Sequence, residues 1–317
     1  MTNTDPSVKC VSIIATAYND ALVLPHFFEK LQSITTTEKE VHYEIIFVND
    51  ASTDSSMDIL RNTKINFEDM AIISLSRRFG HMNSILAGLN ACKGDAAIYV
   101  DVDLQDPLEL IPQMVSNWLA DQELDVIYTT RKTRTGDSPF QLYSTRIAYR
   151  LLRRFISFEF PIDSGDYKLI SRRVVDHLTQ LSEHEPFFRF LVPWMGFKQK
   201  QVFYDRGPRF AGKSHFGFLA ILRQFVEISL IPFSLLPLRV IAFSCGLGFV
   251  LAIAVVFFLV ISLVSGTNTT NDIFTALTCI IIFIAFQFVA LGVIGLYVGS
   301  IFIESKNRPH YIVDRIE

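Results

Sequence analysis

The sequence predicts an α/β protein with a doubly wound, mostly parallel sheet, followed by two membrane-spanning helices. Two observations support this prediction. Short apolar runs that do not alternate in polarity recur between stretches of helical pattern, as expected for strands covered on both faces. Near the C-terminus, two long stretches contain no charged residue, and each exceeds the ~20 apolar residues that cross a bilayer core. Overall, 50% of the 317 residues are hydrophobic.

Five predicted strands alternate with predicted helices in the first part of the chain. The strands are the runs CVSIIATAY (10–18), YEIIFVND (43–50), MAIISLS (70–76), AAIYVDVD (96–103) and LDVIYTT (124–130), and the helices are expected around 21–33, 54–63, 81–92 and 107–120. This βαβ rhythm is typical of a parallel sheet with helices on both faces. Ligands of such sheets bind beyond the carboxyl ends of the strands, where this chain places its polar clusters.

The two uncharged stretches lie between Arg239 and Asp272 and between Asp272 and Glu304. They predict transmembrane helices at about 237–264 and 273–302, joined by a short polar link. The alternative is a helical hairpin buried in a soluble protein. That alternative would need a much larger domain to cover both helices.

Basic residues flank the outer ends of this hairpin, whereas the link carries only Asp272. The basic residues are Arg239, Lys306, Arg308 and Arg315. By the positive-inside rule, the bulk of the protein and both termini are expected in the cytoplasm. The N-terminal residues MTNTDPSVKC lack the apolar core of a signal peptide. The sequence therefore predicts a multi-pass protein of the inner membrane.

Charge and cysteine usage exclude two classes of protein. The net charge of −3 gives no sign of a nucleic-acid partner, which usually leaves a basic domain. The four cysteines, Cys10, Cys92, Cys245 and Cys279, have neither metal-site spacing nor a disulfide framework. This pattern suits a reducing compartment.

A group of carboxylates follows the fourth predicted strand. Asp101 and Asp103 are two residues apart, so both side chains point to the same face. Like charges this close are costly unless a cation offsets them. A divalent ion such as Mg²⁺ or Mn²⁺, held by few carboxylates plus substrate phosphates, is the natural partner. Asp106, which precedes Pro107 and lies three residues before Glu109, is instead predicted to cap the next helix.

Several motifs together resemble those of the family 2 glycosyltransferases, which have the Rossmann-like GT-A fold and use nucleotide-sugar donors. These motifs are TAYND (16–20), VNDASTD (48–54), GHMNSILAGLNACKGD (80–95) and DVDLQDP (101–107). Three further features narrow the resemblance to a smaller group. They are DSGDYKLISRRV (163–174), RGPRFAGKSHF (206–216) and the two C-terminal helices. The narrower group is the polyisoprenyl-phosphate glycosyltransferases, related to dolichol-phosphate mannose synthase, and in particular their bactoprenol glucosyltransferase (GtrB-like) branch.

The resemblance implies a role for each group of polar residues. Asp20 and Asp50 would hold the uracil and ribose of a UDP-sugar. Mg²⁺ or Mn²⁺ on the donor diphosphate would be held by Asp101, Asp103 and Gln105. The diphosphate itself would be gripped by Arg206, Arg209 and Lys213.

Asp166 resembles the acidic residue that acts at the acceptor in this family, and with Asp103 it is predicted to be catalytic. Its role has two interpretations. A lipid phosphate has a second pKa near 6 and arrives largely deprotonated, so removing a proton is a minor need. Asp166 is therefore either a general base or a group that orients a cationic side chain or steadies charge on the sugar.

A basic helix is predicted over 140–156, where Arg146 and Arg150 lie one turn apart. Together with Arg131 after the fifth strand, these arginines are expected to bind the acceptor phosphate, because a guanidinium offers two parallel donors. The predicted organisation is a GT-A domain (1–213), an interfacial amphipathic segment (214–236), the transmembrane hairpin (237–303) and a cytoplasmic tail (304–317).

The expected activity is inverting transfer of a hexose from a UDP-sugar to undecaprenyl phosphate at the cytoplasmic face, for cell-envelope glycan modification. Glucose is implied by the branch alone, with mannose, N-acetylglucosamine and an amino-arabinose as alternatives. A processive synthase is disfavoured because the chain has no Gln-x-x-Arg-Trp motif. A nonenzymatic membrane scaffold of the same fold is the alternative from another class. Gly292, Gly295 and Gly299 would allow a homo-oligomer through close helix packing.

Overall fold

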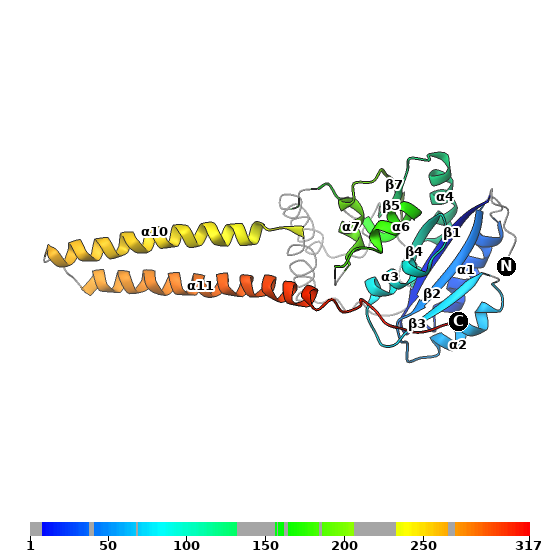
Figure 1. Ribbon diagram of the computed structural model, residues 1–317, viewed down its shortest axis with the longest axis horizontal. Coiled ribbons are helices and arrows are strands. Elements are labelled where there is room, and N and C mark those ends of the chain that lie inside the picture. Colours follow the sequence, from blue (N-terminus) through cyan, green and yellow to red (C-terminus); the bar gives the residue numbers. More distant parts are fainter. Residues whose placement is uncertain are drawn as a thin grey trace. The chain divides into compact units, whose positions relative to one another are not determined.

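The computed structural model describes residues 8–37, 41–67, 69–131, 156, 158–161, 164–183, 186–205, 233–265 and 270–317 (Figure 1). These residues form two compact units. One is an α/β unit that includes residues 308–317, and the other is helical.

The α/β unit is built on an eight-stranded sheet in the order β7-β5-β6-β4-β1-β2-β3-β8. The strands are β1 (Lys9–Ala17), β2 (Val41–Asn49), β3 (Met70–Leu75), β4 (Ala96–Asp101), β5 (Val126–Arg131), β6 (Ser164–Ser171), β7 (Gln199–Tyr204) and β8 (Val313–Ile316). Neighbouring strands are parallel except that β6 runs antiparallel to β4 and β5, and β8 runs antiparallel to β3. The predicted mostly parallel sheet is confirmed, and the five predicted strands all form.

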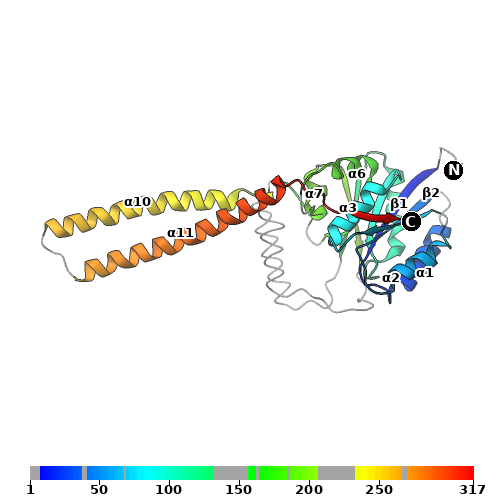
Figure 2. The same cartoon turned by 60° about the horizontal axis from the view of Figure 1, so that its bottom comes forward.

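Helices cover both faces of this sheet (Figure 2). They are α1 (Leu24–Thr37), α2 (Ser56–Lys64), α3 (His81–Ala91), α4 (Ile111–Ala120) with the preceding turn η1 (Leu108–Leu110), α6 (Arg172–Leu178) and α7 (Phe188–Trp194). Alternate side chains of a strand point to opposite faces. On β1, Val11 and Ile13 therefore join α1 in the core, whereas Ile14 meets α3 at Gly88. Because both faces are covered, the central strands β1, β2 and β4 are mostly apolar and mostly buried.

Gly94, between α3 and β4, is required by close packing. A Cβ on this residue would lie 2.7 Å from both the backbone nitrogen and the Oγ of Ser12, and 2.9 Å from the carbonyl oxygen of Ala96. Two of these atoms are backbone and cannot move aside cheaply. Gly94→Ala is expected to lower the free energy of unfolding by about 1–3 kcal/mol, measured by denaturant unfolding of the purified protein.

Gly165→Ala is the control for this prediction. A Cβ at Gly165 would meet its nearest neighbours at 3.8 Å, an ordinary contact. This change should alter the free energy of unfolding by no more than about 0.5 kcal/mol. Equal losses in the two variants would contradict the packing argument.

The C-terminal residues, expected to be a tail from 304 onward, contribute a strand to the sheet. Glu317 exchanges two backbone hydrogen bonds with Ile72, each 2.9 Å long. Its carboxylate accepts two more from the Arg61 guanidinium, at 2.8 and 2.6 Å. Strand β3 would otherwise present a row of unpaired backbone groups, so β8 completes this edge of the sheet.

The helical unit contains α10 (Leu236–Val264) and α11 (Thr270–Ser305). By length and composition, Leu236–Ser262 and Phe274–Ser305 could each cross a membrane. Both agree with the predicted spans to within a few residues. A Cβ on Gly248 would lie 2.6 Å from the Phe283 ring, so the two helices pack closely there. Among the residues that the structure describes, no atom lies within 4 Å of a Cβ built at Gly292, Gly295 or Gly299. The predicted homo-oligomer stays a prediction.

Candidate active site

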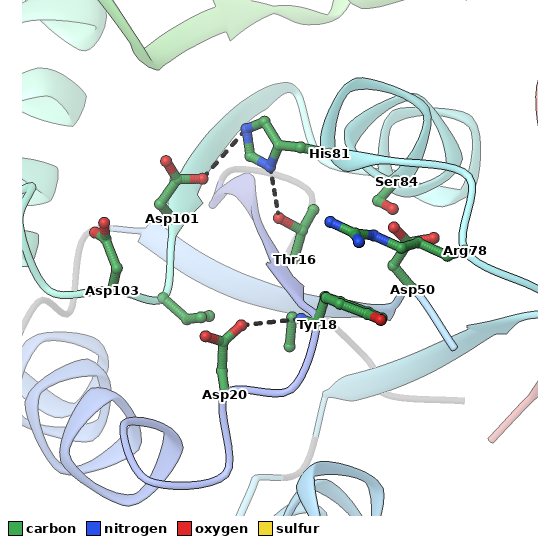
Figure 3. A pocket seen from close by; sticks show the side chains of 11 residues that line it. Thr16, Tyr18, Asp20, Asp50, Arg78, His81, Ser84, Asp101 and Asp103 are labelled. Carbon is green, nitrogen blue, oxygen red and sulfur yellow. Dashed lines mark hydrogen bonds and ion pairs between the residues drawn. The ribbon is translucent and has the colours of Figure 1, made fainter. Parts of the chain in front are cut away.

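A pocket of about 170 Å³ lies at the carboxyl ends of β1, β2 and β4 (Figure 3). It is lined by Thr16, Ala17, Tyr18, Asp20, Asp50, Arg78, His81, Ser84, Asp101, Val102 and Asp103. In Figure 3, Asp101 and Asp103 lie on one side of the pocket, and Asp50 and Arg78 lie on the other. Asp20, Asp50, Asp101 and Asp103, all predicted from the sequence as site residues, therefore line one cavity.

Three of the turns around this pocket hold a residue in the left-handed backbone region. Asn19, Ala51 and Leu104 have φ angles of 57°, 55° and 58°. For residues other than glycine this conformation costs about 1–3 kcal/mol, and it persists only where surrounding contacts enforce it. The Asn19 Oδ1 accepts hydrogen bonds from the backbone nitrogens of Thr53 (2.8 Å) and Asp54 (3.3 Å), which joins the turns after β1 and β2. Hydrogen bonds between the turns that follow β1 and β2 thus hold this part of the pocket rim in place.

The turn after β4 carries the predicted metal-binding residues. The Asp103 Oδ1 accepts a hydrogen bond from the Gln105 backbone nitrogen at 3.0 Å. The Gln105 Oε1 is buried, and it has no hydrogen-bond partner among the described residues. Burial raises the pKa of Asp101 to about 6, with Asp103 adding to the rise and His81 opposing it.

These residues fit a hard divalent ion. Within the described ranges, no three His, Cys, Asp or Glu side chains form a complete metal site by themselves. An ion such as Mg²⁺ is usually held by one or two carboxylates and takes its other ligands from water and substrate phosphates. Two pocket carboxylates and the open Gln105 carbonyl oxygen supply the expected kind of ligand.

His81 is a pocket residue that the sequence reasoning missed. Its Nε2 lies 3.2 Å from the Asp101 Oδ1, and its Nδ1 lies 3.1 Å from the Thr16 Oγ1. In the neutral tautomer with hydrogen on Nε2, the ring donates to Asp101 and accepts from the Thr16 hydroxyl. His81 therefore orients one oxygen of Asp101. Its place at the start of α3, just after the polar end of β3, was the available signal.

Asp50 organises the loop between β3 and α3. It is 4% exposed, and its two oxygens accept hydrogen bonds from the backbone nitrogens of Phe79 (2.7 Å) and Gly80 (2.9 Å). A carboxylate has about four lone-pair sites, so Asp50 can still accept from a ligand. In the turn after β1, the Asp20 Oδ2 accepts a hydrogen bond from the Tyr18 backbone nitrogen at 2.9 Å.

Asp166, on β6, does not line the pocket but forms an ion pair with Arg189 on α7. The Arg189 Nη2 lies 2.9 Å from the Asp166 Oδ2. Burial by itself would raise the pKa of Asp166, but the nearby cations Arg189, Lys168 and His81 outweigh burial and lower it. A carboxylate with a lowered pKa is a weak general base near neutral pH. Both interpretations of Asp166 stay predictions, and the ion pair with Arg189 is the kind of contact that an orienting role requires.

The predicted helix cap at Asp106 is wrong. The N-cap positions of η1 and α4 are Pro107 and Leu110, and neither has a side-chain cap. Asp106 is buried and accepts a hydrogen bond from the Tyr204 hydroxyl, which also accepts one from the Arg131 Nε at 3.3 Å. Because Pro107 has an extended backbone, the helix starts one residue later than predicted, and Asp106 turns toward β7 instead.

The family model "Glycosyl transferase family 2" matches residues 12–179, a range that contains every pocket residue and Asp166. The chain belongs to this family. It is therefore a glycosyltransferase, and its sheet is that of the GT-A fold.

This glycosyltransferase also matches curated relatives over nearly its full length. It is 37% identical to "Uncharacterized glycosyltransferase YkcC" of Bacillus subtilis (strain 168), covering 96% of this chain and 93% of the relative. It is 30% identical to "Bactoprenol glucosyl transferase" of Shigella phage SfV, covering 96% and 97%. Among solved structures, a mannosyltransferase from Pyrobaculum calidifontis has a TM-score of 0.48 at 18% identity, covering 71% of this chain and 63% of that one.

Several predicted site residues of the glycosyltransferase lie outside the described residues. They are Arg146, Arg150, Arg206, Arg209 and Lys213. Most of the predicted interfacial segment (214–236) also lies outside. Their predicted roles stay predictions.

Proposed function

We propose that this glycosyltransferase transfers glucose from UDP-glucose to a polyprenyl phosphate, undecaprenyl phosphate, with inversion at the anomeric carbon. The observation that carries the proposal is an acidic strand-end pocket in the same chain as two helices long and apolar enough to span a membrane. A relative named for bactoprenol glucosyl transfer aligns with 96% of the chain, and this agrees with a lipid acceptor. The reaction takes place at the cytoplasmic face of the inner membrane.

The donor occupies the strand-end pocket. Asp50 accepts hydrogen bonds from the ribose hydroxyls through its remaining lone pairs, and Asp20 accepts from the uracil N–H. The Arg78 guanidinium stacks 4.0 Å from the centre of the Tyr18 ring and forms one wall of the pocket. A divalent metal would be held by Asp101, Asp103 and Gln105, and when bound it offsets the negative charge of the leaving UDP.

The acceptor reacts without a strong base. A phosphate oxygen of the lipid forms a bond to the anomeric carbon as the bond from that carbon to the UDP oxygen breaks, and the electron pair leaves with UDP. A single displacement of this kind inverts the configuration. Because the lipid phosphate is mostly deprotonated near neutral pH, the lowered pKa of Asp166 is no obstacle. Arg131, with Arg146 and Arg150, is proposed to contact the acceptor phosphate.

A donor panel tests the proposed function. Purified full-length protein is incubated with undecaprenyl phosphate, Mn²⁺ and radiolabelled UDP-glucose, UDP-N-acetylglucosamine, GDP-mannose or UDP-amino-arabinose. Label should enter the organic phase from UDP-glucose, and excess EDTA should reduce the rate at least about a hundredfold, as expected when charge stabilisation in the transition state is lost. Lipid-linked label from another donor alone would overturn the choice of sugar. No lipid-linked label from any donor would overturn the proposed function.

A further inference from the structure

A buried charged cluster lies beside the donor pocket, on the face of the sheet that α7 covers. Asp166 and Lys168 are two apart on β6, so they point to this same face. Lys168 is fully buried, and its Nζ donates to the Gly165 carbonyl oxygen at 3.0 Å. Burial lowers the pKa of Lys168 to about 8, although Asp166 opposes that shift. Near neutral pH, Lys168 is still mainly a cation.

Arg189 connects this cluster to the surface. Its side chain is 25% exposed, whereas that of its partner Asp166 is 17% exposed. The second oxygen of Asp166 and the hydroxyl of Tyr99 are buried, and neither has a hydrogen-bond partner among the described residues. Tyr99 is paired with Lys168 across β4 and β6. Within the described part of the chain, the cluster thus combines two cations, one carboxylate and two buried oxygen atoms that have no hydrogen-bond partner there.

The charges of this cluster favour an anionic ligand. The cationic groups that lower the pKa of Asp166 are Arg189, Lys168 and His81. An anion bound beside these cations would make charge-assisted hydrogen bonds with them. The Arg189 guanidinium provides a planar set of donors that matches phosphate oxygens. Asp166 holds one end of that guanidinium in place.

We propose that Arg189, positioned by Asp166 and supported by the charge of Lys168, binds the phosphate of the lipid acceptor. This inference rests on the proposed function, because it assigns the acceptor half of the same reaction. Neither Arg189 nor Asp166 lines the donor pocket, yet Asp166 is close enough to influence the charge of Asp101. A phosphate held at Arg189 therefore lies next to the donor site without occupying it.

Two ligands measured separately test this assignment. Binding of farnesyl phosphate, a short polyprenyl monophosphate, and of UDP with Mn²⁺ is measured by calorimetry on the full-length protein. Arg189→Gln should weaken farnesyl phosphate binding about ten- to a hundredfold and change UDP binding less than twofold. Arg189→Lys should recover only part of the loss, because an ammonium lacks the planar fork. In turnover with undecaprenyl phosphate, Arg189→Gln should raise the KM for the lipid more than it lowers kcat.

The positioning role of Asp166 is tested by a double-mutant cycle. Asp166→Asn alone should weaken farnesyl phosphate binding severalfold, and in the Arg189→Gln background it should have little further effect. If the losses of affinity of the two single variants multiplied in the double variant, Asp166 would act independently of Arg189, and its positioning role would be wrong. Arg173→Gln is the matched control, because it breaks the Arg173–Asp125 ion pair just beyond the C-terminal end of β6, whereas Asp166 lies near the N-terminal end of that strand. This variant should bind both ligands as the wild type does.

The remaining outcomes separate this inference from the proposed function. Weaker UDP binding with unchanged farnesyl phosphate binding would assign Arg189 to the donor, and the inference would be wrong. Unchanged binding of both ligands, or no binding of farnesyl phosphate by the wild type, would also overturn it. Arg189-dependent binding of farnesyl phosphate without sugar transfer to undecaprenyl phosphate would support the anion site and overturn the function.

Discussion

Replacing Asp103 with Ala is expected to lower kcat at least about a thousandfold, the size of effect seen when a group that stabilises transition-state charge is lost. Asp103 lines the pocket, and its neighbours Asp101 and Gln105 complete the proposed metal-binding set. The variant should remain folded, because the side chain packs at a strand end and not in the core. Initial rates at saturating Mn²⁺ measure the effect, and thermal unfolding checks the fold.

Asp103→Asn isolates the charge from the local structure. An asparagine oxygen can still accept the hydrogen bond from the Gln105 nitrogen that Asp103 now accepts. The turn with its left-handed Leu104 should therefore survive. Activity should fall nearly as far as in Asp103→Ala, because the lost quantity is negative charge. Asp121→Ala is the control. It removes a carboxylate that lies just after the end of α4, and it should keep full activity. Near wild-type activity of Asp103→Asn would rule out the metal-ligand role.

Replacing Asp50 with Ala is expected to weaken UDP binding at least about thirtyfold and to lower the free energy of unfolding by about 2 kcal/mol. The loss of stability has a local cause. The Phe79 and Gly80 nitrogens would both lose the carboxylate that now accepts their hydrogen bonds. The loss of binding combines the missing ribose contact with release of the loop that carries Arg78. Calorimetry with UDP and Mn²⁺ and denaturant unfolding measure the two effects.

Asp58→Ala is the control for the Asp50 prediction. Asp58 is an exposed carboxylate in the first turn of α2. Its removal should leave UDP affinity unchanged and stability within about 0.5 kcal/mol of the wild type. If Asp50→Ala lowered stability but kept UDP affinity, Asp50 would be a structural residue of the loop and not part of the donor site.

Several parts of this protein could be predicted because they depend on local pattern in the sequence. The apolar run of β4 and the carboxylates that follow it are adjacent in the chain, so the strand and the acidic strand end were both predictable. The same holds for α10 and α11, because uninterrupted apolar length is a property of one segment. Strand β6 was missed, since its buried Lys168 breaks the apolar pattern that marks a covered strand. Strand β8 was missed because it is only four residues long and exposed.

Contacts between side chains that are distant in the sequence could be identified only from the folded chain. His81 touches Asp101, and Arg189 touches Asp166, although 20 and 23 residues separate the partners. Asp106 accepts a hydrogen bond from the hydroxyl of Tyr204, which lies 98 residues further along the chain. A hydrogen bond weakens when its donor and acceptor move apart by a few tenths of an ångström. Which donors and acceptors come that close depends on the order of the strands in the sheet. Local periodicity and capping preferences contain no information about strand order, so the partners of these charged groups became visible only in the folded chain.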